Sequence, residues 1–311
     1  MEAVQISRYG GPEVLEVNDI DPPVPGDNQV LVKVNFAGLN PFDSKLRSGL
    51  FKKMIPLHFP HTLGGDFAGI VKKTGKKVLG FTVGDGVYGT ANILSGGSGS
   101  LAQYLIAQSD KIAKKPSSLD FAESAAVVLT GVSALRAIEE HISLKAGQKI
   151  LIHGGAGGIG HIAVQLAKAK NAFVAVTVNK FDMEFIKKLG ADKIIDYKIK
   201  KFEEILKDFD AVFDTVGKDI ADRSFPVLKK GGVLVSMVVQ PDGKLAKKYG
   251  IKTYRQQTAV NSRQLNRLTE ILNSGKIKVN VDRIFSIDKI GQAYKYMEEG
   301  HQKGKVVVNI R

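Results

Sequence analysis

The sequence of 311 residues contains no cysteine, which excludes disulfides, thiol nucleophiles and the thiolate ligands of most structural zinc sites. It also lacks low-complexity tracts and fixed-period repeats, and its hydrophobic share of 43% and charged share of 24% are typical of a folded globular protein. The first residues lack the basic and apolar parts of a signal peptide, and no apolar run reaches the roughly 18 residues of a membrane span. We therefore expect a cytoplasmic protein with no membrane partner.

Positive charge is in excess, because 45 lysines and arginines face 31 aspartates and glutamates, for a net charge of +14. This balance favours polyanions or a phosphorylated cofactor as ligands. The densest basic stretches, at 72–77 and 248–252, are short, and the other basic residues are dispersed. The pattern therefore favours solvated loops over a nucleic-acid surface.

Two domains are expected, because the chain is longer than one ordinary core of roughly 100–200 residues. From Met1 to about Ser117 it contains short β-branched runs between glycine and proline turn signals, which predicts a small, mostly β domain. A helical pattern follows over 121–141, with Asp120 or a neighbouring serine placed to cap its first amides.

Strand-like and helix-like segments alternate between Lys149 and Met237. Five apolar strands are predicted, at KILIH, AFVAVTV, KIIDY, AVFDTV and VLVSMV, and the segments between them are predicted as helices, the last of them ADRSFPVLKKGG. This alternation indicates a doubly wound parallel sheet and hence the α/β class. The tail holds a helix at NRLTEILNSGK, then a strand, a helix and a last strand, and is expected to return to the first domain.

Glycines are concentrated where the first of these strands meets its helix, in HGGAGGIG. Gly155, Gly157 and Gly160 fit the pattern G-x-G-x-x-G in the strand-to-helix context that the pattern requires. The first glycine permits a tight turn, the second lets backbone approach a pyrophosphate, and the third lets helix and strand pack closely. The alternative is a tight turn without a ligand. The four further strand-and-helix segments downstream favour a dinucleotide site.

The end of the second strand bears on which dinucleotide binds. An acidic residue about 20 residues after the glycines would bind the ribose 2′-hydroxyl of NAD, and Thr177 stands there. Its neutral side chain tolerates a 2′-phosphate, while Asn179 and Lys180 add a donor and a cation. The sequence therefore favours NADPH over NADH. The alternatives are a helix-capping role for Asn179 and a solvated charge for Lys180.

Motifs along nearly the whole chain carry a family resemblance: GLNPFDSKLRSG, PHTLGGDFAGIV, VGDGVYG, AAVVLTGVSALRAI, HGGAGGIG, LGADKIIDY, FDTVG, LKKGGVLVSM and GKVVVNI. In this order they resemble the medium-chain dehydrogenase/reductase superfamily, in its zinc-independent quinone oxidoreductase and enone reductase branch. The resemblance implies a GroES-like β domain at 1–122, a Rossmann NADP-binding domain at 123–265, and a C-terminal segment at 266–311 that returns to the first domain. It also implies a substrate cleft between the domains, and relatives are often homodimers.

The resemblance also bears on metal. Zinc-dependent relatives have a Cys, a His and a second Cys where this chain has Asn40, Gly65 and Ala126, and none of these can bind zinc as its counterpart does. His58 and His61 lie close together but have no third ligand at a suitable spacing, so they are interpreted as structural. We expect no metal.

The cofactor contacts that the resemblance implies follow by position. Gly158 and Ile159 match the turn over the pyrophosphate, and Tyr197 matches a tyrosine that reaches the 2′-phosphate together with Thr177, Asn179 and Lys180. One departure is Asp182, which stands where many relatives have a phosphate-binding lysine. The resemblance also implies contacts with the nicotinamide end of the cofactor for Thr130, Met237 and Val238. Gly304 and Lys305 match the C-terminal segment that closes over the cofactor.

The resemblance places Lys45 in contact with both cofactor and substrate. Its ammonium can stabilise an oxyanion when hydride adds to the β-carbon of an activated alkene, and Asn40 is a second candidate donor. Lys45, Tyr88 or water could then protonate the α-carbon. Asp43 is interpreted as a structural residue of the same loop.

The predicted function is zinc-independent hydride transfer from NADPH to the conjugated double bond of enones or alkenals, or to quinones. One alternative is a one- or two-electron quinone reductase. An alternative of another class, motivated by the +14 charge, is an NADPH-binding sensor or RNA-binding protein without turnover.

Overall fold

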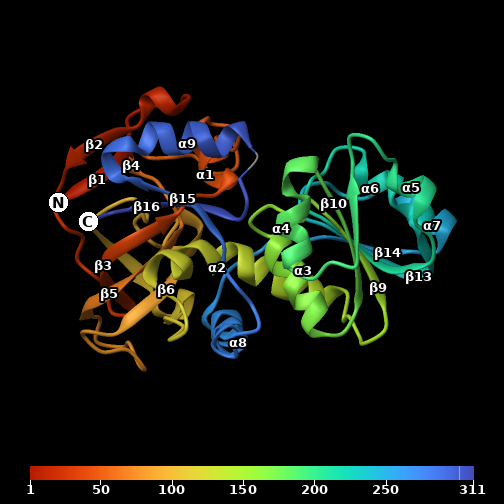
Figure 1. Cartoon of the computed structure of the whole chain (residues 1–311). Helices are drawn as coiled ribbons and strands as arrows, with labels where there is room; N and C mark the ends of the chain where they lie inside the picture. The colour runs from red at the N-terminus through yellow and green to blue at the C-terminus, as the bar shows by residue number, and fades with distance from the viewer. Residues whose placement is uncertain (301) are drawn as a thin grey trace. The chain divides into compact units, whose positions relative to one another are not determined.

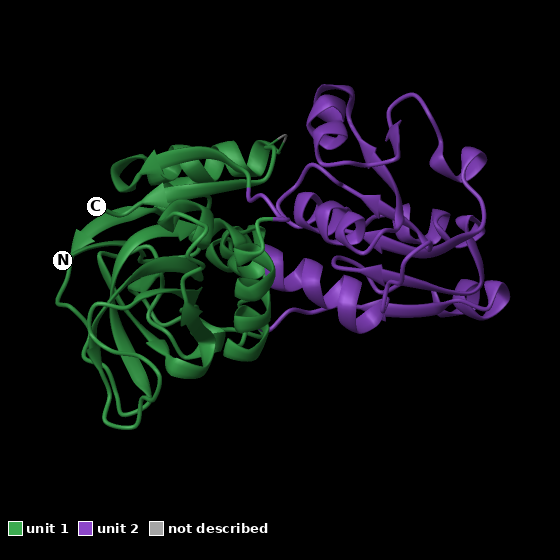
Figure 2. Ribbon diagram, turned by 60° about the horizontal axis from the view of Figure 1, so that its bottom comes forward, with its two compact units in different colours: residues 1–129, 260–275, 280–311 green, residues 130–259, 276–279 purple. Residues whose placement is uncertain are grey.

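The computed structural model describes residues 1–300 and 302–311. The chain forms two compact units, each built from more than one stretch of sequence (Figure 2). Unit 1 comprises 1–129, 260–275 and 280–311, and unit 2 comprises 130–259 and 276–279. The tail thus lies with the N-terminal part, apart from Lys276–Val279, and both chain termini lie in unit 1 (Figure 1).

Unit 1 is built on a seven-stranded sheet with the order β15-β16-β3-β5-β6-β8, and β7 also pairs with β3. Apart from the parallel pair β15 and β16, these strands pair antiparallel. The strands are β3 (Gln29–Gly38), β5 (Asp66–Thr74), β6 (Gly86–Thr90), β7 (Tyr104–Gln108), β8 (Ile112–Lys114), β15 (Val281–Ser286) and β16 (Lys305–Asn309). A second sheet has the order β2-β1-β4, from β1 (Glu2–Ile6), β2 (Glu16–Asp19) and β4 (His61–Thr62).

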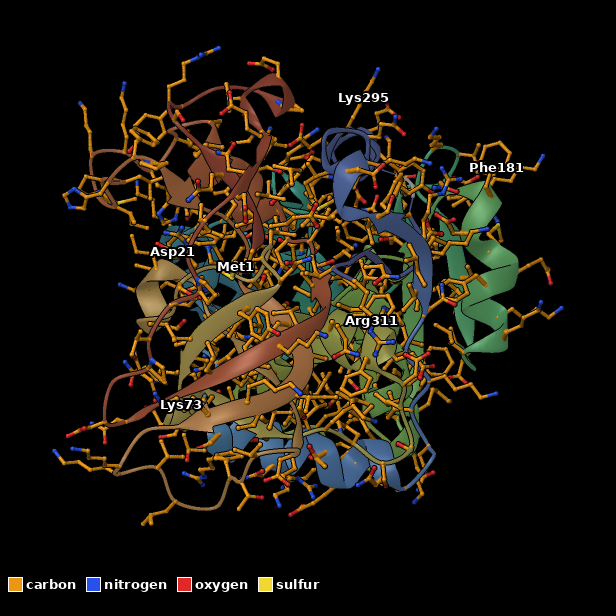
Figure 3. The ribbon with its side chains drawn as sticks, turned by 90° about the vertical axis from the view of Figure 1, so that its left-hand side faces the viewer. Met1, Asp21, Lys73, Phe181, Lys295 and Arg311 are labelled. Carbon is orange, nitrogen blue, oxygen red and sulfur yellow. The ribbon has the colours of Figure 1, made fainter. Side chains whose placement is uncertain are left out.

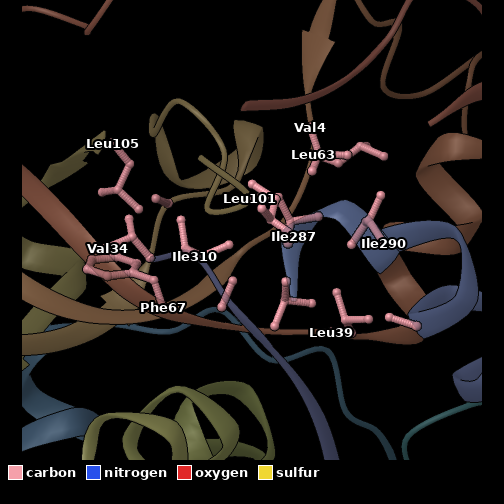
Figure 4. Close-up of a cluster of buried hydrophobic side chains, with 14 of the residues drawn as sticks. Val4, Val34, Leu39, Leu63, Phe67, Leu101, Leu105, Ile287, Ile290 and Ile310 are labelled. Atoms are coloured by element: carbon pink, nitrogen blue, oxygen red, sulfur yellow. The ribbon is translucent and has the colours of Figure 1, made fainter. Parts of the chain in front are cut away.

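The core of unit 1 draws apolar side chains from both ends of the chain. Figure 4 shows part of it, in which Val4 and Leu63 lie beside Leu101 and Ile287. The alternating burial along β7, where Leu105 and Ala107 point inward, reflects a sheet with one face on the core. Burial of such apolar surface contributes about 25 cal/mol per Å² to folding, which makes this mixed core the main source of stability of the unit.

Four α-helices complete unit 1: α1 (Pro41–Arg47), the first part of α2 (Phe121–Leu135), α8 (Ser262–Asn273) and α9 (Ile290–Glu299). The predicted cap of α2 is confirmed, because Asp120 Oδ1 accepts the Glu123 amide at 2.8 Å and Glu123 Oε2 accepts the Asp120 amide at 3.0 Å. Helical structure continues as a π-helical segment over Arg136–His141. The stretch Phe121–His141 is long and apolar enough to cross a membrane, but most of it is buried inside the protein, as in a core helix.

Unit 2 is a six-stranded parallel sheet with the order β11-β10-β9-β12-β13-β14. Its strands are β9 (Lys149–His153), β10 (Phe173–Val178), β11 (Lys193–Asp196), β12 (Phe209–Asp214), β13 (Leu228–Ser236) and β14 (Lys252–Arg255). This is the dinucleotide-binding strand order, in which ligands bind beyond the carboxyl ends of the strands where the order reverses. Here the reversal lies between β9 and β12.

The helices of unit 2 are α3 (Gly160–Ala169), α4 (Met183–Lys188), α5 (Phe202–Ile205), α6 (Ile220–Arg223) and α7 (Gly243–Tyr249). In Figure 1 the strands run between α3 and α4 on one side and α5, α6 and α7 on the other. The helix predicted at ADRSFPVLKKGG is wrong in its second half. Pro226 lies in a short 3-10 turn after α6, and β13 already begins at Leu228. The sixth strand, β14, was not predicted.

Candidate functional site

The turn between β9 and α3 has the backbone conformation that its glycines require. Gly154 has φ +71°, a region that side chains other than glycine rarely adopt. A Cβ on Gly155 would overlap the side chain of Val176 in β10, and a Cβ on Gly160 would overlap the carbonyl oxygen of Gly154. Gly155 and Gly160 thus allow strand and helix to pack closely, as the sequence pattern predicts.

Gly157 is different, because a Cβ there would meet only the Gly154 carbonyl oxygen, at 3.5 Å. Gly157, Gly158 and Ile159 are all partly exposed. They directly precede α3, and the first amides of a helix have no carbonyl partner within it. The turn therefore leaves open backbone beside a helix N-terminus, which is the arrangement that binds pyrophosphate, and its residues fit a dinucleotide.

The predicted 2′-phosphate residues lie at the carboxyl ends of the neighbouring strands β10 and β11. Tyr197 donates its amide to the Val178 carbonyl at 3.2 Å, which brings it close to Asn179. Lys180 and Tyr197 are exposed, whereas Asn179 is 8% exposed and its Oδ1 accepts the Phe181 amide at 2.8 Å. Asn179 therefore caps the next turn through its Oδ1, and its contact with the 2′-phosphate, like that of Lys180, stays a prediction. Figure 3 shows Phe181, which is 81% exposed, at the outer surface of the same turn.

Thr177 is buried, and its hydroxyl belongs to a neutral network. His153 Nδ1 lies 2.9 Å from Thr177 Oγ1, and His153 Nε2 lies 3.1 Å from Ser224 Oγ. Because Ser224 donates its one hydroxyl proton to the Ile220 carbonyl at 2.7 Å, it accepts from Nε2, and Thr177 must donate to Nδ1. Burial lowers the pKa of His153 to about 4, so the ring is neutral at neutral pH. Thr177 thus presents no charge at the end of β10.

The carboxyl ends of β12 and β13 are held together by Asp214, which is completely buried. Its Oδ1 accepts the amides of Val216 and Gly217, each at 2.9 Å, and its Oδ2 accepts the hydroxyl of Ser236 at 2.7 Å. The Asp214 carbonyl also accepts the Met237 amide at 2.9 Å. This network holds the segment that continues to Val238, which is 40% exposed. Met237 and Val238 therefore lie at the same sheet edge as the glycine turn.

In unit 1, Lys45 and Asn40 have different surroundings. Lys45 is exposed on α1, whereas Asn40, which directly precedes α1, is 4% exposed. Asn40 Nδ2 donates to Asp66 Oδ2 at 2.8 Å, and Asn40 Oδ1 accepts from Lys305 Nζ at 2.7 Å. Asp43 Oδ2 accepts the Asn40 amide at 2.9 Å, which confirms its structural role. Lys45 is therefore the accessible cation of this loop, and Asn40 is part of a buried charged cluster.

Gly304 and Lys305 have structural contacts within unit 1, and the cofactor contact that the resemblance implies for them stays a prediction. Lys305 is 5% exposed, and its ammonium also donates to the Leu39 carbonyl. Gly304 has φ +86°, and a Cβ there would overlap the Asn280 carbonyl oxygen. Gly304 thus lets the chain enter β16 with the Lys305 side chain directed into unit 1. Thr130 is buried in α2, and its nicotinamide contact stays a prediction.

Tyr88 is not the proton donor considered from the sequence. It is completely buried in unit 1, where its hydroxyl lies 2.8 Å from the Leu265 carbonyl, to which it donates, and 2.9 Å from Thr269 Oγ1. Burial raises the pKa of this hydroxyl well above its usual value. Tyr88 therefore joins α8 to the sheet and does not exchange protons with a ligand.

No group of three or more His, Asp or Glu side chains that could hold a metal ion lies within 1–300 and 302–311. His61 lies in β4 and pairs with Ile6 in the small sheet of unit 1, which agrees with a structural role. Independence from zinc stays a prediction.

Comparison with known proteins gives two family models. The alcohol dehydrogenase GroES-like domain matches 26–117, and the zinc-binding dehydrogenase model matches 189–308. Among curated proteins, the chain is 38% identical to the 2-methylene-furan-3-one reductase of Solanum lycopersicum and 36% identical to the chloroplastic NADPH-dependent alkenal/one oxidoreductase of Arabidopsis thaliana. Each alignment covers 99% of this chain and 79% of the relative.

The chain belongs to the medium-chain dehydrogenase/reductase superfamily, in its quinone oxidoreductase and enone (alkenal) reductase branch. Solved structures agree with this assignment. The quinone oxidoreductase of Coxiella burnetii has a TM-score of 0.90 at 34% identity, and the superposition covers 100% of this chain and 99% of the Coxiella chain. The Escherichia coli quinone oxidoreductase complexed with NADPH has a TM-score of 0.89 at 27% identity, and the superposition covers 99% of this chain and 100% of the Escherichia coli chain. The GroES-like and Rossmann-type architecture is thereby confirmed.

Sequence reasoning missed three residues that organise these sites: Asp66, His153 and Asp214. Each stands at the end of an apolar strand and is almost completely buried. A polar residue at a strand end is a usable signal, because strand ends meet at one sheet edge and a buried polar group needs partners there. The identity of those partners depends on pairing between distant strands, which this signal does not contain.

Proposed function

We propose that this protein uses NADPH to reduce the conjugated double bond of enones or alkenals, or to reduce quinones, without a metal. The observation that carries the proposal is the open backbone at Gly157 to Ile159, at the reversal point of a parallel sheet with the dinucleotide-binding order. The names of the relatives, which include an NADPH-dependent alkenal/one oxidoreductase and quinone oxidoreductases, support it.

The residues of unit 2 would bind and orient the cofactor. The amides of Gly158 and Ile159 would hold the pyrophosphate, with Gly157 leaving room for it, and Asn179, Lys180 and Tyr197 would hold the 2′-phosphate. Thr177 supports NADPH because it places no carboxylate beside that phosphate. When bound, NADPH supplies the hydride.

The residues of unit 1 would act on the acceptor. Addition of hydride to the β-carbon moves charge to the carbonyl oxygen, where the exposed ammonium of Lys45 and the amide of Asn40 are the available donors. With Tyr88 excluded, Lys45 or water remains as the source of the proton for the α-carbon. The same donors suit quinones, which also accept hydride at a conjugated position.

NADPH oxidation with matched acceptors tests the proposal. A 2-alkenal, a vinyl ketone and 1,2-naphthoquinone are compared with the saturated aldehyde of the same chain length as the 2-alkenal. We expect turnover with the conjugated acceptors and none with the saturated aldehyde. The ratio of kcat/KM between 2-alkenal and naphthoquinone separates an enone reductase from a quinone reductase. Turnover of the saturated aldehyde alone, or of no acceptor, would contradict the proposal.

Lys45→Ala tests the role of the exposed cation. We expect kcat with a 2-alkenal to fall about 100–1000-fold, which is the cost of removing one oxyanion donor. Lys53→Ala is the matched control, because Lys53 is another exposed lysine in the segment that follows α1. Equal kcat values for both variants would remove Lys45 from the mechanism.

A homodimer and a cytoplasmic location stay predictions. Sedimentation at several protein concentrations would test the first, and imaging of the tagged protein would test the second. An RNA-binding role without turnover is not favoured, because the relatives named here are oxidoreductases or reductases.

A further inference from the structure

Unit 1 contains a cluster of buried charges where three strands end at one edge of the sheet. In the register of the sheet, Gly38 at the end of β3 pairs with Asp66 at the start of β5 and with Val307 near the start of β16. Asn40 therefore lies between the first residue of β5, which is Asp66, and the first residue of β16, which is Lys305. We call Asn40, Asp43, Asp66 and Lys305 the strand-end cluster.

The hydrogen bonds of the strand-end cluster hold the Asn40 carboxamide in one orientation. Lys305 Nζ can only donate, so it must face Asn40 Oδ1, and the Asp66 carboxylate accepts from Nδ2. Asp66 Oδ2 is itself held by the Leu129 amide at 3.1 Å, and Lys305 also donates to the Leu39 carbonyl. A rotated amide would bring two donors together at Lys305 and two acceptors together at Asp66. The rotated state is therefore excluded while both charges are present.

This orientation leaves one Nδ2 hydrogen of Asn40 beyond its bond to Asp66. A cation bound to the oxygen of an amide draws electron density from the nitrogen, which makes the remaining N–H a stronger donor. Lys305 thus both fixes and polarises the amide. An asparagine without such a neighbour would be free to present either its oxygen or its nitrogen to a ligand.

Within 1–300 and 302–311, no second cation lies within hydrogen-bond distance of the carboxyl groups of the strand-end cluster. From α9, Tyr294 is completely buried, its hydroxyl has no partner, and burial raises its pKa. From α1, the Arg47 guanidinium lies 5.0 Å above the Tyr294 ring and pairs with Glu298 at 2.8 Å. Lys305 is therefore the one cation that hydrogen-bonds within the cluster among the residues that the structure describes.

Burial of this cluster is costly, because apolar side chains of similar volume would fill the same space at no desolvation cost. Burial raises the pKa of Asp43 to about 7 and that of Asp66 to about 6, although Lys305 opposes both shifts. Burial lowers the pKa of Lys305, and the two carboxyl groups oppose that shift. The charges are thus kept against a cost in stability, which points to a use in the reaction.

We propose that Lys305 and Asp66 are positioning residues that orient and polarise Asn40, so that its second Nδ2 hydrogen binds the carbonyl oxygen of the conjugated acceptor. The inference rests on the proposed function. It gives Lys305 a role through Asn40, with no contact to cofactor or substrate.

A double-mutant cycle with Asn40→Ala and Lys305→Met tests this coupling. We expect each single variant to lower kcat with a 2-alkenal about 100–1000-fold, with the dissociation constant of NADPH within about twofold of the parent. Because Lys305 acts through Asn40, the second substitution is expected to cost less than about threefold in the Asn40→Ala background. Independent, multiplicative losses, or a parallel loss of NADPH binding, would overturn the proposal.

Two further variants keep the test decisive if Lys305→Met does not fold. Asp66→Asn is nearly isosteric, but its new amide can present either a donor or an acceptor to Asn40. The Asn40 carboxamide is then no longer held in one orientation. We therefore expect kcat to fall while the melting temperature stays within a few degrees of the parent. Lys305→Arg restores a cation and is expected to recover part of the rate lost in Lys305→Met. An Asp66→Asn variant with parental kcat would overturn the proposal.

Lys295→Met is the matched control for Lys305→Met. Lys295 lies on α9 beside Tyr294 in the sequence, and Figure 3 shows its side chain extending away from the unit. Its removal is expected to leave kcat and the NADPH dissociation constant unchanged. Absence of turnover in the parent protein would count against the proposed function, whereas parental turnover that persists in Lys305→Met would count against this inference alone.

Discussion

The candidate site of unit 2 consists mainly of backbone groups, whereas that of unit 1 consists mainly of side chains. Unit 2 offers bare backbone between β9 and α3, supported by uncharged partners such as the neutral His153 and Thr177. Unit 1 offers side chains: Lys305 and Asp66 are buried at the ends of strands, and Asp43 is buried in α1 beside them. The difference suits the proposed ligands. A phosphate already carries charge and needs donors, whereas an acceptor gains charge only during the reaction and needs donors that are already oriented.

Gly157→Val should show the largest effect in this comparison. The Cβ of the added side chain meets only the Gly154 carbonyl oxygen, at 3.5 Å, so the melting temperature should stay within a few degrees of the parent. It would occupy the place of the pyrophosphate, and NADPH affinity should fall at least about 100-fold, or about 2.7 kcal/mol. Titration of NADPH fluorescence measures this affinity, and an unchanged value would contradict the assignment of the glycine turn as the pyrophosphate site.

Gly160→Ala should do the reverse, with its main effect on stability. A Cβ at Gly160 overlaps the Gly154 carbonyl and approaches Gly155 Cα at 2.7 Å, so strand and helix must separate. The free energy of unfolding in urea should fall by about 2 kcal/mol. Because the two glycines are three residues apart, the pair separates ligand contact from packing. Equal stability losses in both variants would remove that distinction.

The two units should also respond to pH with opposite signs. In unit 1, burial raises the pKa of Asp43 to about 7, so the folded state holds a proton that the unfolded state has lost above about pH 4. This contribution to stability is present at low pH and is lost as pH rises to 7, at up to about 1.4 kcal/mol per pH unit. Asp43→Asn should therefore gain stability relative to the parent as pH rises from 4 to 7. A constant difference in unfolding free energy would contradict it.

In unit 2, burial lowers the pKa of His153 to about 4. Between this pH and about pH 6.5, the unfolded state therefore binds a proton at His153 that the folded state does not. The contribution of His153 is present above about pH 6.5 and is lost as pH falls toward 4. His153→Gln should lower stability at pH 7 and narrow the difference from the parent toward pH 4. Urea unfolding at several pH values measures both variants, and a His153→Gln difference that widens on acidification would be the wrong sign.

Lys180→Ala should have the smallest effect, on cofactor choice alone. Loss of an exposed cation near a 2′-phosphate should reduce the ratio of kcat/KM for NADPH over NADH about 3–10-fold, with little change for NADH. Lys187→Ala, which removes an exposed lysine on α4, is the control. An NADPH-over-NADH ratio of kcat/KM that rises in Lys180→Ala would mean that another group selects the cofactor. The buried Asp182 lies two residues after Lys180 in the sequence.

The same comparison shows how much the sequence could predict. The glycine turn, five parallel strands and the returning tail follow from local patterns: spacing, periodicity and turn residues within a few dozen positions. The strand-end cluster does not, because Asn40 meets a residue 26 positions away and another 265 positions away. Only the strand pairing brings these residues together. Lys305 could be assigned to the cofactor from its motif, but its buried environment is a property of the fold.

Prediction also failed where one residue changes the local outcome. Pro226 lies in the short 3-10 turn after α6 and cannot continue that helix, and β13 begins at Leu228, five residues before VLVSM. The edge strand β14 has only one half-buried and no buried residue, so its sequence KTYR has no apolar run to reveal it. For Asn179 the structure bears out the capping alternative, because its Oδ1 accepts the nearby Phe181 amide.

Transfer of deuterium from NADPH labelled at nicotinamide C4 to a 2-alkenal tests the central claim most directly. Mass spectrometry of the product, after turnover in buffer with a metal chelator, locates the label. The account predicts one deuterium on the β-carbon of a saturated aldehyde. An allylic alcohol labelled at the carbonyl carbon, or turnover that stops with the chelator, would contradict it.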